Sequence, residues 1–119
     1  MKITKKLVGC DYYFPGDKEV RNIYRVTIAN RGQRASFKFG DSIANTQEHK
    51  SLDDDSILAC VKADYFNTKE YYPTFEDFAD SFGYGKDSRE AEKIYKHCLK
   101  QAEKLHRVFT QEDIEKLPD

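Results

Sequence analysis

Hydrophobic and polar positions alternate through the first forty residues, and the period changes in the second half of the chain. β-Branched and aromatic residues recur between Ile23 and Ala29 and between Arg34 and Phe39, which is typical of half-buried strands. A third strand is expected from Leu7 to Phe14, and Pro15-Gly16-Asp17 would turn the chain toward the other two. The first forty residues therefore predict a three-stranded antiparallel sheet.

The two central strands can be aligned through a tight turn at Arg31 and Gly32. One face of this hairpin, the predicted core face, then carries three cross-strand pairs: Tyr24 with Phe39, Val26 with Phe37, and Ile28 with Ala35. The other face presents Arg25 opposite Lys38, Thr27 opposite Ser36, and Ala29 opposite Arg34. Like charges directly opposite each other are unfavourable, so Arg25, Arg34 and Lys38 are candidate anion-binding residues.

The second half of the chain has a helical period. Between Leu52 and Tyr65, one helical face collects Ile57, Leu58, Val61 and Tyr65, and the acidic residues 53–55 suit a helix N-terminus. Thr74, Asp87 and Thr110 each place a capping oxygen three residues before a carboxylate. These signals predict helices near 75–82, 88–107 and 111–117.

These elements define the fold class as α+β, with an N-terminal three-stranded antiparallel sheet followed by about four helices, the longest near 88–107. With 119 residues and 39% hydrophobic content, the chain suits one domain, 1–119, in which 1–40 is mainly β and 52–117 mainly α.

The stretch from Gly83 to Ser88 contains two glycines and a lysine, but it lacks the pattern of a phosphate-binding loop. Asp87 stands where such a loop needs a hydroxyl, and the preceding segment has helical character. We therefore interpret it as a helix stop at Gly83, a turn, and a helix start capped by Asp87.

The long predicted helix has two distinct faces. Its core side carries Ala91, Ile94, Tyr95, Cys98, Ala102 and Leu105. The opposite side is a basic ridge made of Arg89, Lys93, Lys96, Lys100, Lys104 and Arg107. Two interpretations stay open: a solvated face partly neutralised by i,i+4 pairs, or a contact surface for an anionic partner.

Charge is unevenly distributed along a chain of net charge −1. Residues 1–40 hold nine Lys/Arg and three Asp/Glu, whereas residues 41–80 hold three and ten. The acidic segment offers an alternative contact surface that mimics phosphates, formed by Asp53, Asp54, Asp55 and Asp64.

Other chemistry finds little support in the sequence. The three histidines lack metal-ligand spacing, so we expect no metal and no cofactor. Cys98 lies on the predicted core side, where a buried thiol is inert, and no other catalytic set can be assembled, so we expect no enzyme. Three widely spaced cysteines and the absence of a signal region or membrane-spanning run predict a cytoplasmic protein with free thiols.

The motif Thr74-Phe-x-Asp-Phe-x-x-x-Phe-Gly-Tyr84, followed by Asp87-Ser-Arg-x-Ala-x-x-Ile-Tyr95, resembles the C-terminal part of small, mostly uncharacterised tailed-phage and prophage proteins. The resemblance covers roughly residues 72–117, and Gly85 departs from the acidic residue common there. It implies an accessory protein that acts by binding in the host bacterial cytoplasm.

Two function classes follow. The first is a non-enzymatic phage-encoded protein, monomer or homodimer, that binds and inhibits or redirects a host protein or nucleoprotein complex, such as a CRISPR effector. The alternative is a nucleic-acid-binding module that uses the basic ridge and the hairpin arginines, with Tyr12, Tyr13 or Tyr24 available for base stacking.

Overall fold

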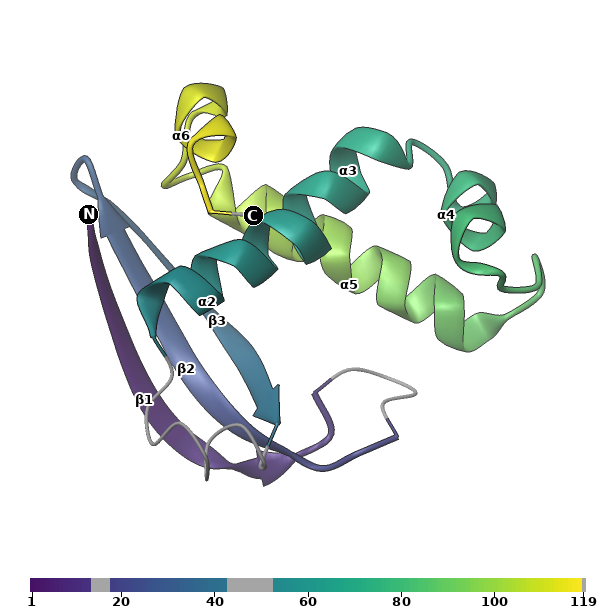
Figure 1. Cartoon of the computed structure of the whole chain (residues 1–119), viewed down its shortest axis with the longest axis horizontal. Coiled ribbons are helices and arrows are strands. Elements are labelled where there is room, and N and C mark those ends of the chain that lie inside the picture. The colour runs from purple at the N-terminus through teal and green to yellow at the C-terminus, as the bar shows by residue number, and fades with distance from the viewer. Residues whose placement is uncertain (14–17, 43–52, 119) are drawn as a thin grey trace.

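The three predicted strands form one antiparallel sheet at the N-terminal end of the fold (Figure 1). The structure is a computed structural model that describes residues 1–13, 18–42 and 53–118. The strands are β1 (Lys2–Asp11), β2 (Arg21–Asn30) and β3 (Gln33–Ser42), in the order β1-β2-β3. The turn predicted at residues 15–17 lies outside the described residues.

The hairpin register is the one predicted from the sequence. Val26 pairs with Phe37, and Arg25 pairs with Lys38. The two loop residues take the positive φ angles of a type I′ turn, 51° at Arg31 and 78° at Gly32. The register follows from this short loop, because a slip of one residue would move every apolar side chain of β2 to the solvent face.

Strand β1 begins five residues earlier than predicted and ends at Asp11. It pairs with β2 along its length, and the register shifts between Leu7 and Gly9. The extra residue at Val8 is a β-bulge, which re-aims the side chains that follow it. Lys2 to Lys6 therefore belong to the sheet, although the sequence prediction had left them outside it.

The described part of the chain after the sheet contains four helices. Their bounds are α2 (Asp54–Cys60), which continues through η1 (Val61–Phe66) into α3 (Asn67–Tyr71), then α4 (Phe75–Phe82), α5 (Arg89–Leu105) and α6 (Gln111–Glu115). The fold is therefore α+β, as predicted. The predicted start of the first helix at Leu52 lies outside the described residues, and its end lies six residues beyond the predicted Tyr65.

The segment η1 is a turn of π-helix inside this first helix, and the Asn67 amide donates to the Lys62 carbonyl five residues earlier. A π turn places one additional residue in the helical circuit. Val61, Tyr65 and Phe66 are consequently all buried in the core, which an uninterrupted 3.6-residue period does not predict for two adjacent aromatic residues.

The helix caps agree with the sequence prediction at two of three positions. Thr74 accepts a hydrogen bond from the Asp77 amide, and Thr110 forms a reciprocal capping box with Asp113. The third prediction was wrong: Ser88, not Asp87, caps α5 by accepting from the Ala91 amide at 3.2 Å. Both residues are good caps, and α5 starts one residue later than predicted. Gly83 ends α4 at φ 75°, as predicted.

The core lies between one face of the sheet and the helices. Val26, Ile28 and Phe37 from the sheet are buried together with the predicted apolar face of the first helix and the second half of the predicted face of α5, from Cys98 to Leu105, whereas Ile94 is only partly buried. Gln101 is also buried, which the sequence pattern did not indicate. Helix α4 packs back on α5, with the Phe78 ring 5.2 Å from the Tyr95 ring. The core thus occupies only one side of the sheet.

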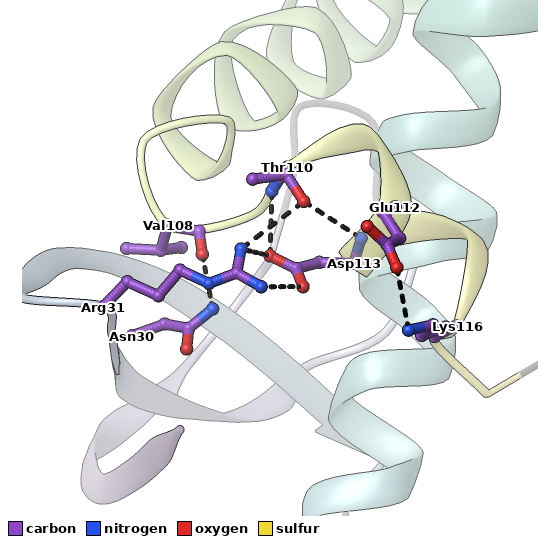
Figure 2. Close-up of polar contacts among 7 residues, drawn as sticks. All are labelled: Asn30, Arg31, Val108, Thr110, Glu112, Asp113 and Lys116. Carbon is purple, nitrogen blue, oxygen red and sulfur yellow. Dashed lines mark hydrogen bonds and ion pairs between the residues drawn. The ribbon is translucent and has the colours of Figure 1, made fainter.

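The hairpin turn is docked on α6 (Figure 2). The Arg31 guanidinium donates to both carboxylate oxygens of Asp113, at 2.5 and 3.0 Å, and the Asn30 side chain donates to the Val108 carbonyl at 2.8 Å. Positive φ is uncommon for a residue with a side chain. The bidentate pair with Asp113 explains what arginine contributes at this turn position, since a fork of two parallel bonds needs a guanidinium.

Candidate nucleic-acid interface

Three cations form a row across the face of the sheet that points away from the core. Lys6 of β1 is the register partner of Arg25 in β2, and Arg25 is the partner of Lys38 in β3. All three residues are exposed. Register partners on neighbouring strands have Cα atoms about 4.5–5.5 Å apart, so the three positive side chains start from closely spaced positions.

A second cationic row lies four residues along the strands. It contains Lys2 and Arg34, the register partners of Ala29 from either side. At about 3.3 Å per residue the two rows are separated by about 13 Å. We call the five residues Lys2, Lys6, Arg25, Arg34 and Lys38 the sheet cations.

Short hydroxyl side chains fill the position between the two rows. Thr4 pairs with Thr27, and Thr27 pairs with Ser36. The Thr27 and Ser36 hydroxyls are 2.8 Å apart and hydrogen-bonded. Threonine and serine side chains are much shorter than those of lysine and arginine, so a strip of hydroxyl groups lies between two rows of long cationic side chains. We call this strip, together with its flanking cations, the trough.

Among the described residues, the sheet cations have no acidic partner, in contrast to other basic residues of the same segment. Lys5, on the core side of β1, lies 3.2 Å from Asp54, and Arg21 lies 2.9 Å from Glu19. Within residues 1–13, 18–42 and 53–118, no carboxylate lies within ion-pair distance of the five sheet cations. Their charge is therefore available to an external anion.

The basic ridge is exposed along its length, as predicted, but α5 ends at Leu105, two residues earlier than predicted, so Arg107 lies just beyond the helix. Lys96 of the ridge is paired with Glu92 at 2.8 Å. The ridge faces away from the α5 residues that pack on the core, and α5 lies on the core side of the sheet. The structure therefore brings Arg25, Arg34 and Lys38 together on one surface and places the ridge on another.

The four residues of the predicted acidic contact surface are separated in the structure. Asp53 caps α2 by accepting from the Ser56 amide at 2.7 Å, and Asp54 pairs with Lys5. Asp55 is exposed in the same turn, whereas Asp64 lies in η1 beside a different part of the molecule. The four carboxylates thus do not form one continuous patch.

Asp64 borders a cavity of about 230 Å³ between η1, α4 and α5. Cys98 and His97 also line it. Burial, and secondarily the Asp64 carboxylate, raises the pKa of the Cys98 thiol to about 11, so little thiolate exists near neutral pH. Burial also raises the pKa of Asp64. The described geometry agrees with a structural role for this thiol.

His97 provides a pH-dependent contribution to stability. Burial, followed by the charges of Lys100 and Lys104, lowers the pKa of His97 below its usual 6.5. A folded-state pKa below the unfolded value means that the unfolded chain binds the proton first, so stability present above pH 6.5 is lost as pH falls toward the folded pKa. The slope for one proton is at most about 1.4 kcal/mol per pH unit.

We expect His97→Gln to reduce the loss of unfolding free energy between pH 7 and pH 5, measured by urea denaturation. His106→Gln is the comparison variant: burial and Lys69 also lower the pKa of that ring, but it is more exposed, so this substitution should reduce the loss by less. A wild-type loss that persists unchanged in His97→Gln would show that His97 is protonated equally in both states.

Sequence reasoning missed the two sheet cations of β1, Lys2 and Lys6. Ile3 and Leu7 point toward the core side at even spacing, which is a strand signal. Lys5 occupies the core-side position between them, and this lysine disrupts the alternation. Its partner Asp54 is distant in sequence, so the local pattern could not predict the ion pair that neutralises Lys5 at this position.

The described residues contain neither a metal-binding cluster nor a membrane-spanning helix. They contain no cluster of three or more His, Cys, Asp and Glu side chains arranged to hold a metal ion, and none of their helices is long and apolar enough to cross a bilayer. In comparisons with known proteins, no family model, no curated protein and no solved structure matches this chain.

Proposed function

We propose that this chain binds nucleic acid through the outer face of its sheet. The observation that supports this proposal is the row of Lys6, Arg25 and Lys38, which stand in register across three strands without a described carboxylate partner. Like charges directly opposite in a sheet destabilise it. A bound polyanion would remove that repulsion and release its own counterions.

The chemistry of the trough fits a phosphodiester backbone. Lysine and arginine contact phosphate oxygens through charge, and serine or threonine hydroxyls donate hydrogen bonds to them. In the trough, hydroxyls from Thr4, Thr27 and Ser36 lie between two cationic rows. A backbone that crosses the three strands would meet donors beneath it and positive charge on both sides.

The test is the salt dependence of binding. Each phosphate contact with a single strand contributes about −0.7 to the slope of log Kobs against log salt concentration, so five contacts predict a slope near −3.5. Fluorescence anisotropy with a labelled oligonucleotide should show affinity falling about 100-fold between ~50 and ~200 mM salt. An oligonucleotide that does not bind at ~50 mM salt would refute the proposal.

The expectation of a phage-encoded protein that acts on a host protein stays a prediction. Neither the comparisons nor the geometry of the described residues tests it. A cationic sheet face also suits an acidic protein surface. If an acidic protein bound to the sheet cations and oligonucleotides did not, the result would favour protein binding over nucleic-acid binding.

A further inference from the structure

A surface hollow adjoins the cationic row at the β-bulge of β1. It has a volume of about 260 Å³. The lining includes Val8, Tyr12 and Ile23 as apolar groups and Asp11 and Lys38 as charged groups. Lys38 belongs to the row with Lys6 and Arg25, so the hollow and the trough are continuous at this residue.

Two of these three apolar groups are exposed to solvent, whereas Ile23 beneath them is buried. Tyr12 is 57% exposed and Val8 49% exposed. The bulge between Leu7 and Gly9 changes the register of β1 immediately before these residues, and bulges commonly re-aim side chains at functional positions. The volume of the hollow equals that of about nine waters at ~30 Å³ each, which is enough for one nucleobase.

Resting on the proposed nucleic-acid function, we infer that the interface takes single-stranded nucleic acid and that one unpaired base stacks on Tyr12 in this hollow. Every base has a π-face that can stack on an aromatic ring, and a positively charged groove beside such a ring is a general arrangement for binding single strands. A base held within a duplex is already stacked and paired, so it could not enter the hollow.

The two charged groups of the hollow determine how the bound nucleic-acid strand is oriented. The Asp11 carboxylate, whose Oδ1 accepts from the Tyr12 amide at 2.7 Å, repels phosphate but can accept from the amino group of a base. Lys38 attracts phosphate. The base therefore lies toward Tyr12 and Asp11, and the backbone lies toward Lys38 and the trough.

The test compares Tyr12→Ala with Tyr12→Phe on three labelled probes: oligo-dC, oligo-rC and a duplex of equal length. Stacking contributes about 1–3 kcal/mol per base, so Tyr12→Ala should weaken binding of at least one single-stranded probe by about tenfold. The salt slope and duplex affinity should not change. Tyr12→Phe keeps the aromatic face and should bind like the wild type. The two single-stranded probes distinguish DNA from RNA.

Three results would overturn this inference. Unchanged binding of both single strands by Tyr12→Ala would show that no base stacks there, and the proposed function would survive if binding still depended on the sheet cations. Equal loss on single strands and duplex would show that Tyr12 does not read an unpaired base. Absence of binding to all three probes by the wild type would refute the proposed function itself.

Discussion

Replacing Lys6, Arg25 and Lys38 together with glutamine should lower affinity for a single-stranded oligonucleotide about 100-fold at ~0.1 M salt, because three phosphate contacts would be lost. The slope of log Kobs against log salt concentration should become shallower by about 2 for the same reason. All three side chains are exposed, so the variant should fold, and removal of lateral repulsion should if anything stabilise the sheet. Fluorescence anisotropy across a salt series measures both quantities.

The matched control carries the same loss of charge on the other basic surface. Lys93, Lys100 and Lys104 are exposed residues of the α5 ridge, and Lys93→Gln/Lys100→Gln/Lys104→Gln removes three charges without touching the sheet. We expect only a small loss of affinity in this control, caused by reduced long-range attraction. A large loss in the ridge variant with a small loss in the sheet variant would assign binding to α5 instead.

The second large effect concerns the core that supports the sheet. Leu105 of α5 is fully buried and packs with residues of the sheet and the first helix. Leu105→Ala should reduce the free energy of unfolding by about 2–5 kcal/mol, since it removes apolar contact and leaves a cavity. Urea denaturation followed by circular dichroism measures this change.

Lys104→Ala is the natural control for the core variant, because Lys104 precedes Leu105 on the exposed side of the same helix. A surface substitution of this kind should change stability by less than about 0.5 kcal/mol. If Leu105→Ala were equally mild, α5 would not be packed on the sheet as described, and the separation of the two basic surfaces would lose its basis.

The elements that depend on local patterns could be predicted from the sequence. The hairpin register followed from the alternation of apolar residues and from a two-residue loop, although arginine is an unusual choice at positive φ. The structure supplies the reason, because Arg31 pairs with Asp113 in α6. A contact between residues 82 positions apart leaves no local signal.

The features that were missed depend on packing over longer distances. Phe66 is buried beside Tyr65 because η1 contains a π turn, and a 3.6-residue period cannot anticipate that insertion. Likewise, Lys2 and Lys6 lie in a strand whose core-side Lys5 is paired with Asp54 of α2, a residue distant in sequence. Three of the five sheet cations could therefore be predicted from the hairpin pattern, and the other two required the pairing of β1 with β2.

The hydroxyl floor of the trough is an intermediate case. Thr27 and Ser36 were correctly placed opposite each other from the hairpin pattern. Their position between two cationic rows became evident only when β1 contributed Lys2 and Lys6 on either side of Thr4. A site that is assembled from three strands can be recognised only after all three registers are known.

The most direct test of the central claim is to map the contact surface by NMR while a single-stranded oligonucleotide is titrated into the isotopically labelled protein. We expect the largest chemical-shift changes at backbone amides of β1, β2 and β3 near the sheet cations, and only small changes in α5. Changes concentrated along Arg89 to Arg107, with the sheet unaffected, would contradict it.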